Sequence, residues 1–412
     1  MYKNISKCRV CNNQNLINVF SLGDQALTGR FPKSVDEDIY SGPVDLYLCS
    51  GKDSCGLLQM KQTYDSDEMY GSNYGYRSGL NESMLKHLKS KVDKIMKLNV
   101  LKDNDLILDI GSNDGSTLKF YPDNFRKIGV DPTGEKFKKY YPSNIKLICD
   151  FFSADLLKDI LDEDRIKVVT SFSMFYDLPD PVAFASDINK ILADDGIWIF
   201  EQSYMPTMLK TNSFDTVCHE HLEFYGLKQI QWILDKAGMK INDLEFNDVN
   251  GGSFSITASK KKSKFKQNLP LIQKTIDREN DLKLETEEPY IEFRKRIDVE
   301  KNKLFDFLSQ CKKDNLLVAA LGASTKGNVL LQYYNITSDL IKYVGEVNDD
   351  KFGSFTPGTK IPIIPEDELL KLKPDFLVVL PWHFYSHFIN MKHLKGQKLV
   401  FPLPQLKVVE IK

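Results

Sequence analysis

The feature that most constrains the fold of this chain is a series of short apolar segments that alternate with helical stretches between residues 105 and 258. The apolar segments span residues 106–110, 127–131, 145–149, 167–172, 196–202 and 253–258. This alternation is typical of βαβ units, in which a parallel sheet carries helices on both faces. The last segment is expected to form an antiparallel strand at the sheet edge.

The rest of the chain is organised around this central region. Apolar residues at helical spacing predict an amphipathic helix over residues 81–98, and a charged stretch with helical periodicity follows the central region. A second βα pattern begins near residue 316. We therefore expect an α/β protein with four parts: a cysteine-rich module at 1–75, a central Rossmann-like domain at 76–260, a helical connector at 261–308 and a smaller Rossmann-like α/β domain at 309–412.

The charge balance gives no sign of a polyanionic partner. The chain of 412 residues has 55 basic and 57 acidic residues, a formal net charge of −2, so neither nucleic acid nor a membrane surface is an expected partner. No apolar run is long enough to span a membrane, and the first residues lack the apolar core of a signal peptide. A cytoplasmic location, with reduced thiols, is the resulting expectation.

Four cysteines in the first 60 residues predict a structural zinc site. Cys8 and Cys11 form a CxxC knuckle, and Cys49 and Cys55 form a second, wider pair. Two close pairs of thiolates supply the four tetrahedral ligands that zinc needs without a large apolar core. The alternative is four unrelated thiols. A catalytic zinc is not expected, because four thiolates leave no open coordination position.

The turn after the first central segment carries the chemistry of a cofactor site. Asp109, Gly111, Asn113 and Gly115 lie between a predicted strand and a predicted helix, so the backbone can approach a ligand closely. The turn lacks the third glycine of a dinucleotide fingerprint and begins with an acid. A carboxylate there suits the cationic methionyl end of S-adenosylmethionine, whereas it would repel a pyrophosphate.

Two later positions are expected to complete this site. Asp131 ends the second segment, where an acid accepts hydrogen bonds from ribose hydroxyls. Asp150 and Phe151 follow the third segment and offer an acid and an aromatic wall for adenine. The alternative is a generic α/β turn with no ligand.

A histidine- and acid-rich segment after the fifth strand predicts the catalytic group. His219, Glu220 and His221 lie where strand ends form the ligand crevice, together with Glu201 and Tyr225 as expected substrate-binding residues. A histidine beside a carboxylate is a common general base near neutral pH. The alternatives are a metal site, for which the HExxH spacing and a third ligand are missing, and structural histidines.

A glycine- and tyrosine-rich segment precedes the amphipathic helix. Tyr74 and Tyr76 lie in it, and they are expected to close over the substrate as part of a loop or lid. A tyrosine-rich packing loop is the alternative.

Together these motifs resemble the sugar C-methyltransferases. In order, the chain has CxxC, CGLLQ, YxYRSG, LDIGSNDGSTL, CHEHLEFY, NGGSF, GASTKGNVLLQ, PGTKIPI and LPWHF. The most similar type acts on the C-3 carbon of dTDP-linked 4-keto-deoxysugars, and the resemblance covers essentially the whole chain. It implies an N-terminal zinc module, a class I S-adenosylmethionine-dependent methyltransferase domain and a C-terminal Rossmann-like domain.

The resemblance also implies roles for single residues. His221 is the implied base, Glu220 assists it, and Tyr76 or Tyr74 lies over the active site. Lys326, Asn328 and Asn348 are implied to line the nucleotide-sugar site; a lysine at a helix start after a glycine turn suits a pyrophosphate, and a plain structural turn is the alternative.

Three positions depart from the family pattern. Cys218 stands where family members carry tyrosine, the second cysteine pair is wider than CxxC, and GASTKGN replaces GAPAKGN. The expected reaction is methyl transfer to the carbon next to the ketone of a nucleotide-linked sugar. Methylation of a sugar oxygen or nitrogen, and an inactive zinc-module binding protein, are the alternatives. The sequence leaves open the nucleotide, the sugar and the oligomeric state, with a monomer as one option.

Overall fold

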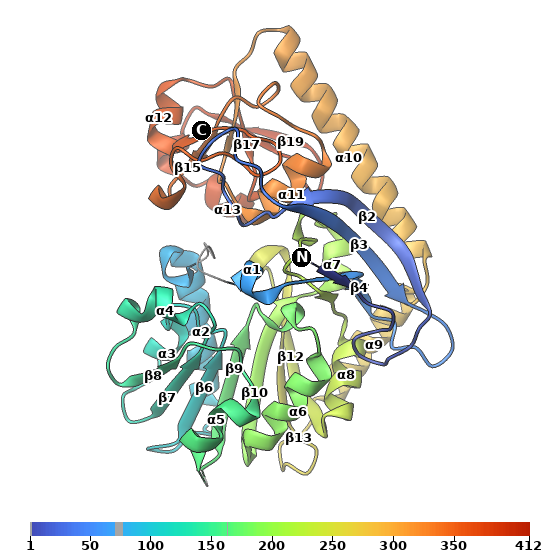
Figure 1. Ribbon diagram of the computed structural model, residues 1–412, viewed down its shortest axis with the longest axis vertical. Helices are drawn as coiled ribbons and strands as arrows, with labels where there is room; N and C mark the ends of the chain where they lie inside the picture. The colour runs from blue at the N-terminus through green and yellow to red at the C-terminus, as the bar shows by residue number, and fades with distance from the viewer. Residues whose placement is uncertain (1, 71–76, 163) are drawn as a thin grey trace.

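The computed structural model describes residues 2–70, 77–162 and 164–412, and in this part of the chain the strands form four sheets. Figure 1 shows the largest sheet in the lower part of the molecule and the C-terminal sheet in the upper part, with β2, β3 and α10 beside them. The fold is mixed α/β, with parallel strands in both large sheets.

The central sheet has seven strands in the order β12-β13-β10-β9-β6-β7-β8. Strands β6 to β10 run parallel to their neighbours in this set, whereas β13 pairs antiparallel with both β10 and β12. The strands are β6 (Leu106–Ile110), β7 (Arg126–Val130), β8 (Ile145–Ile148), β9 (Ile166–Phe172), β10 (Leu192–Ser203), β12 (Met239–Asn247) and β13 (Ser253–Lys260).

One strand prediction is wrong in its position. The segment at 253–258 is antiparallel, as expected, but β13 lies inside the sheet and β12 forms the edge. The sequence does not indicate β12 because the alternation of apolar and polar residues is broken at Asn242 and Asp243, where the pairing register with β13 also shifts. Strand β12 lies on the outer side of β13.

Alternation along the central strands places helices on both faces of the sheet. On β6, Leu106, Leu108 and Ile110 pack with α5, α6 and α8, whereas Ile107 packs with α2 and α3. The helices of this region are α2 (Glu82–Lys97), α3 (Ser116–Lys119), α4 (Gly134–Phe137), α5 (Ala154–Leu161), α6 (Pro181–Ile191), α7 (Met205–Lys210) and α8 (Leu227–Lys236). The amphipathic helix predicted over 81–98 is therefore confirmed as α2.

The N-terminal strands do not close a sheet by themselves. The order of the four-stranded sheet is β11-β4-β3-β2, so β11, which follows the histidine-rich segment 219–221, is its edge. The elements are β1 (Tyr2–Asn4), β2 (Leu16–Ala26), β3 (Ser41–Cys49), β4 (Leu58–Met60), β5 (Gln62–Tyr64), α1 (Ser66–Tyr70) and β11 (Glu223–Phe224), with β1 paired to β5. The module thus shares its hydrogen bonding with the central part of the chain.

The C-terminal sheet has the order β16-β15-β14-β17-β18-β19, in which only the last pair is antiparallel. This is the strand order of a Rossmann sheet. Its elements are β14 (Val318–Leu321), α11 (Thr325–Tyr333), β15 (Val344–Glu346), β16 (Ile363–Pro365), α12 (Glu366–Lys371), β17 (Phe376–Val379), α13 (Tyr385–Phe388), β18 (Lys398–Phe401) and β19 (Lys407–Glu410).

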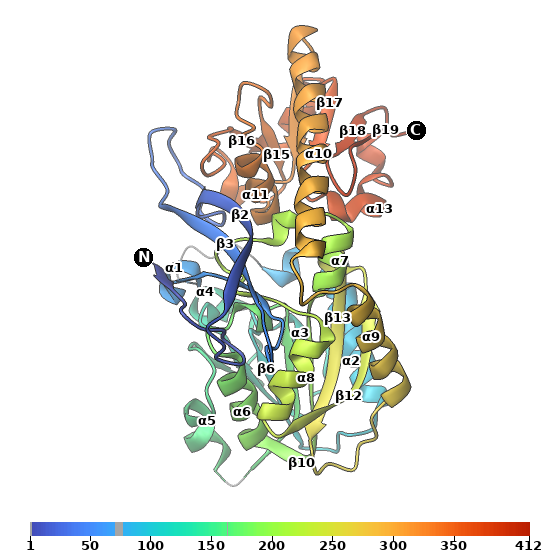
Figure 2. The ribbon, with the colours of Figure 1, turned by 90° about the vertical axis from the view of Figure 1, so that its right-hand side faces the viewer.

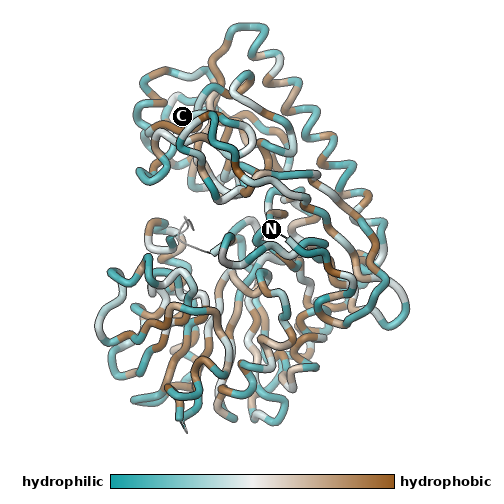
Figure 3. The backbone as a smooth tube through the Cα atoms, in the orientation of Figure 1, coloured by the Kyte–Doolittle hydropathy of each residue, from teal (hydrophilic) through white to brown (hydrophobic). Residues whose placement is uncertain are grey.

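Two helices connect the large sheets. They are α9 (Leu269–Asp281) and α10 (Glu288–Lys313), and α10 continues beyond residue 308, where the connector was expected to end. Figure 2 shows α10 as one long helix next to β2, and Figure 3 shows brown, apolar stretches on the tubes of both large sheets. Apolar residues of β2, β3, α7, α10 and the C-terminal sheet form one continuous core.

Short 3₁₀ turns complete the described elements: η1 (Ser78–Leu80), η2 (Lys138–Tyr140), η3 (Phe175–Asp177), η4 (Phe214–Thr216), η5 (Val249–Gly251), η6 (Asp349–Lys351), η7 (Trp382–Phe384) and η8 (Lys392–Leu394). Among the described helices, none combines the length and the apolar character needed to cross a membrane.

Candidate active site

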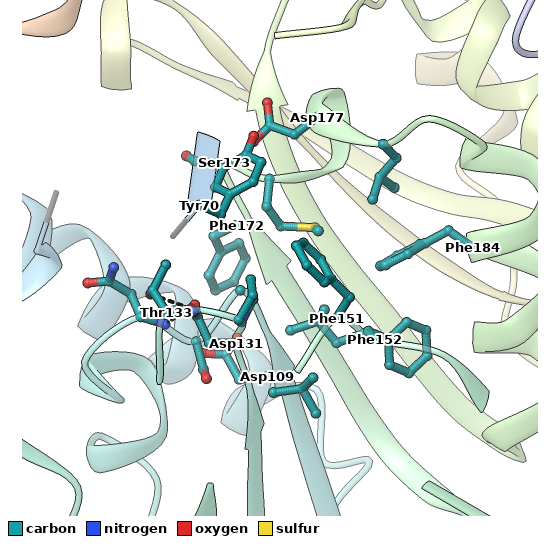
Figure 4. A pocket seen from close by; sticks show the side chains of 18 of the residues that line it. Tyr70, Asp109, Asp131, Thr133, Phe151, Phe152, Phe172, Ser173, Asp177 and Phe184 are labelled. Carbon is teal, nitrogen blue, oxygen red and sulfur yellow. Dashed lines mark hydrogen bonds between the residues drawn. The ribbon is translucent and has the colours of Figure 1, made fainter. Parts of the chain in front are cut away.

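A cavity of about 480 Å³ opens at the carboxyl ends of β6, β7 and β9. This volume is in the range of pockets that hold small ligands. Figure 4 shows Asp109, Asp131 and Thr133 on one side of the cavity and Phe151, Phe152 and Phe184 on the other. The cavity therefore has a polar, acidic wall and an aromatic wall.

The turn after β6 has the backbone shape that the glycines were expected to allow. Gly111 has a φ of +69° and Gly115 a φ of +73°. A Cβ on Gly111 would lie 3.0 Å from the Met174 side chain, and one on Gly115 would lie 2.9 Å from the Tyr141 ring. Gly111 and Asn113 line the cavity, whereas Gly115 closes the turn behind it without lining the cavity.

Asp109 is a buried carboxyl group at the cavity wall. Thr170 Oγ1 donates a hydrogen bond of 2.5 Å to its Oδ1, and the residue is 2% exposed. Burial raises the pKa of Asp109 to about 7, from an ordinary value of 3.8. In such buried surroundings a nearby positive charge, such as the methionyl end of S-adenosylmethionine, strongly stabilises the ionised carboxylate.

Asp131 is held in place by the backbone around it. Its Oδ2 accepts 2.7 Å from the Asn113 amide, and its Oδ1 accepts from the Thr133 amide and hydroxyl at 2.7 and 2.5 Å. A carboxylate has about four acceptor positions, so Asp131 retains capacity for a ribose hydroxyl. Asp150 and Phe151 also line the cavity. The carboxylates and the aromatic side chain at this cavity suit the cationic, ribose and adenine parts of S-adenosylmethionine.

Several cavity residues were not predicted from the sequence. Thr133, Phe172 and Asp177 line the cavity, and Figure 4 shows Asp177 near Tyr70 at its upper end. Phe172 ends β9 and Asp177 belongs to the turn that follows. The rule that ligands bind at the carboxyl ends of parallel strands would have indicated this segment.

The four N-terminal cysteines form one cluster. Their sulfur atoms all lie within 4.8 Å of one another, with Cys8 Sγ 3.5 Å from Cys55 Sγ and Cys11 Sγ 3.4 Å from Cys49 Sγ. A tetrahedral zinc with bonds of about 2.3 Å requires sulfur separations of about 3.8 Å. The thiols thus fit a structural zinc, and the wider second pair does not prevent this.

His221 does not line this cavity; together with Tyr176 and Thr216 it lines a separate, much smaller pocket. Its Nδ1 lies 2.6 Å from the carbonyl oxygen of Thr216, which can only accept, so Nδ1 carries the proton and Nε2 keeps a lone pair. Its ring contacts Tyr176 edge-on at 4.5 Å, and Tyr176 precedes the cavity residue Asp177. Burial, reinforced by the Lys326 charge, lowers the pKa of His221 to about 4.

The neighbours of His221 point in different directions. His219 is 1% exposed and contacts the Tyr64 ring edge-on at 4.7 Å, within the N-terminal module. Glu220 lies close to the cavity, because the Tyr70 hydroxyl is 3.5 Å from its carbonyl oxygen and Tyr70 lines the cavity. Burial raises the pKa of the Glu220 carboxyl. Tyr74 and Tyr76 lie outside the described residues.

Two expected substrate-binding residues, Glu201 and Tyr225, have their side chains engaged by other residues of the protein. Glu201 Oε1 lies 2.6 Å from His87 Nε2, and its Oε2 accepts 2.6 Å from Lys91 Nζ. Tyr225 is fully buried, with its ring stacked on Phe175 at 5.6 Å. Neither lines the described cavity.

The three expected C-terminal residues contact different parts of the molecule. Lys326 Nζ donates 2.7 Å to the carbonyl oxygen of Asn250, and Asn328 Nδ2 donates 2.7 Å to the carbonyl oxygen of Thr28. Asn348 caps η6 by accepting from the Asp350 amide. At the glycine turn itself, Glu346 Oε2 accepts 3.0 Å from the Ala323 amide, so a pyrophosphate at that amide would meet a carboxylate.

Comparison with known proteins identifies three consecutive domains in this chain. Family models match residues 8–70 ("Putative zinc binding domain"), 81–244 ("Methyltransferase domain") and 248–404 ("C-methyltransferase C-terminal domain"). A C-methyltransferase of Streptomyces niveus, NovU, is 26% identical over 414 residues, which cover 98% of this chain and 97% of that protein.

Two solved structures show a more remote likeness. Magnesium protoporphyrin IX methyltransferase from Synechocystis PCC 6803 is 14% identical and covers 44% of this chain and 88% of its own, with a TM-score of 0.33. An S-adenosylmethionine-dependent methyltransferase from Clostridium acetobutylicum ATCC 824 is 12% identical and covers 43% of this chain and 92% of its own, with a TM-score of 0.32.

The Rossmann-like sheet, the acid-lined cavity and the family models define an S-adenosylmethionine-dependent methyltransferase with a structural zinc. Within that class, the three matched domains span nearly the whole chain in one order. The chain therefore resembles C-methyltransferases over nearly its whole length, with a zinc-binding domain, a methyltransferase domain and a C-methyltransferase C-terminal domain in that order.

Proposed function

We propose that this enzyme methylates the carbon next to the ketone of a nucleotide-linked sugar, with His221 as the base. The observation that carries the proposal is the 2.6 Å contact between His221 Nδ1 and the Thr216 carbonyl oxygen. It fixes the tautomer in which Nε2 is a proton acceptor. Carbon needs such a base, because it becomes nucleophilic only after deprotonation to an enolate.

The low pKa of His221 is compatible with this role. With a pKa of about 4 the imidazole is neutral at physiological pH and ready to accept a proton. When the proton leaves the sugar, the enolate charge that forms beside the ring stabilises the imidazolium, since an opposite charge nearby favours the charged form. The backbone carbonyl of Thr216 holds the ring orientation throughout.

The cofactor cavity and His221 are joined through one short segment. Tyr176 contacts the His221 ring, and the next residue, Asp177, lines the cavity. When bound, S-adenosylmethionine supplies an electrophilic methyl group. In the proposal Asp109 and Asp131 hold its cationic and ribose ends, and Glu220 supports the polar surroundings between the cavity and the imidazole.

For the nucleotide we propose the interface between the central and C-terminal domains. Lys326, Asn328 and Asn348 remain the proposed contacts. Because Glu346 occupies the turn amide of Ala323, the proposed contact to the diphosphate runs through the Lys326 ammonium rather than through that amide. As domains we propose the zinc-binding module at 1–75, the methyltransferase domain at 76–260, a helical connector from 261 to the end of α10 at Lys313, and the C-terminal Rossmann-like domain after it.

The test is an assay with S-adenosylmethionine and matched pairs of nucleotide-linked 4-keto and reduced sugars. Product analysis by NMR should show a new carbon–methyl bond only with the keto sugars. In D₂O without the cofactor, the wild type should exchange the proton next to the ketone, and His221→Ala should not. A methyl ether or methylamine formed on a reduced sugar would replace the carbon proposal with oxygen or nitrogen transfer.

A further inference from the structure

The zinc module contacts the catalytic segment directly through a shared strand. β11 begins two residues after His221 and pairs antiparallel with β4, with Glu223 opposite Gln59 and Phe224 opposite Leu58. The Met60 amide also donates 2.8 Å to the Leu222 carbonyl oxygen. The backbone that follows His221 is therefore held by β4 of the N-terminal module.

The cysteine cluster fixes β4 at its start. Cys55 lies three residues before β4, and the Cys49 amide donates 2.8 Å to the Leu57 carbonyl oxygen. On the other side, Gln229 Nε2 donates to the carbonyl oxygens of Cys55 and Gly56 at 2.9 and 3.1 Å. The position of β4 thus depends on the loop that carries two of the zinc ligands.

Arg9, between the ligands Cys8 and Cys11, links the same parts a second time. Its Nη1 donates 2.6 Å to the Met60 carbonyl oxygen, and its Nη2 donates to the Gln62 carbonyl oxygen and the Thr63 hydroxyl at 3.0 and 2.7 Å. Its Nε lies 3.6 Å from Glu223 Oε1, and the two side chains are 3% and 0% exposed. One buried guanidinium thus connects the zinc knuckle, the strand β4 and the catalytic segment.

We propose that the zinc module positions the catalytic segment, with Arg9 as the positioning residue that transmits the order of the zinc site to residues 218–226. The inference rests on the proposed role of His221. Zinc bound by the four thiolates fixes the knuckle around Arg9 and the loop before β4. Without zinc, both supports of β11 loosen, while the cofactor cavity, whose described lining includes no residue of 218–226, stays intact.

The first experiment follows hydrogen exchange in the full-length enzyme before and after zinc removal with a chelator, with zinc content measured on the same samples. Amides in 218–226 should exchange at least tenfold faster without zinc, whereas those in 106–116 should not change. Readdition of zinc should restore the slow exchange. Unchanged exchange in 218–226 after complete zinc loss would overturn the proposal.

The second experiment uses Arg9→Lys, which keeps all four cysteines and the positive charge but loses the branched donor set. It should retain one zinc per chain and bind S-adenosylmethionine within twofold of wild type, while kcat falls at least tenfold and 218–226 exchanges faster. Cys311→Ser, a cysteine outside the cluster, serves as the control and should leave zinc content and exchange in 218–226 unchanged. Wild-type kcat and exchange in Arg9→Lys would also overturn the proposal.

The exchange readout separates this inference from the proposed function. If His221→Ala kept full activity, the base assignment would fail while the coupling of zinc to 218–226 stood on the exchange data. If hydrogen exchange in 218–226 did not change on zinc removal while His221→Ala lost activity, the assignment of His221 as the base would hold and the positioning role of the zinc module would fail.

Discussion

Asp109 is the residue whose replacement tests the cofactor site most directly. Burial raises its pKa from 3.8 to about 7, and the folded protein therefore holds a proton there that the unfolded chain has lost. Between these two values stability falls as pH rises, because the folded state binds more protons than the unfolded state. The gap of about three pKa units corresponds to about 4 kcal/mol.

Asp109→Asn removes the free-energy cost of ionising a buried carboxyl group and keeps an oxygen that can accept a hydrogen bond from Thr170. Relative to the variant, wild type should lose up to about 4 kcal/mol of unfolding free energy between pH 4 and pH 8 in the absence of cofactor. Denaturant unfolding of both proteins at several pH values measures the difference. Taking the difference cancels the contributions of the other buried acids.

The same replacement should weaken cofactor binding. A cation binds the ionised carboxylate, so the affinity of wild type for S-adenosylmethionine should fall as pH drops below about 7, approaching tenfold per pH unit. Calorimetry should show a proton released on binding. Asp109→Asn should bind at least tenfold more weakly at pH 8 and lose this slope, whereas Asp131→Asn should weaken binding and keep it.

Parallel pH profiles of wild type and Asp109→Asn, for both unfolding and binding, would refute this role of Asp109. In that case the carboxyl group neither ionises at a cost in the free protein nor faces the cation in the complex.

Three other changes test separate parts of the molecule. His221→Ala should lower kcat at least about 100-fold in a methyl-transfer assay, with unchanged cofactor affinity by calorimetry; wild-type turnover would exclude it as the base. Cys8→Ser should remove zinc by metal analysis and lower the unfolding temperature, and full zinc retention would contradict the four-thiolate site. Gly115→Ala should cost about 2 kcal/mol of unfolding free energy, because its φ is +73° and the added methyl group meets the Tyr141 ring. The control Gly23→Ala, with a φ of +70° and open space around it, should cost about 1 kcal/mol. Equal losses of unfolding free energy would exclude the contact with Tyr141.

The parts of the site that lie within one βα unit could be predicted from the sequence. Asp109, Gly111, Asn113 and Asp131 are close along the chain or at the ends of adjacent strands, so the pattern of a strand, a glycine turn and a second strand already places them together. The four cysteines form a second such case, because zinc in a structural site takes four tetrahedral ligands and two close cysteine pairs supply all four.

Residues whose surroundings come from distant segments could not be placed in this way. Glu201 lies near the carboxyl end of β10, where a ligand-binding acid is expected, but α2 brings His87 and Lys91 to its carboxylate. Tyr225 stacks on Phe175 in the core. For such side chains the partner across the fold decides whether a polar group faces a ligand, and no local pattern contains that partner.

The sequence by itself determined the class of fold, the cofactor turn and the zinc ligands, since each depends on local chemistry: periodic apolar residues, glycines at a left-handed turn and paired thiols. Tertiary structure alone decided that β13 lies inside its sheet and that β11 belongs to the sheet of the zinc module. Strand neighbours are chosen by hydrogen bonds and packing between residues far apart in the chain. That choice connects Arg9 to the segment that follows His221.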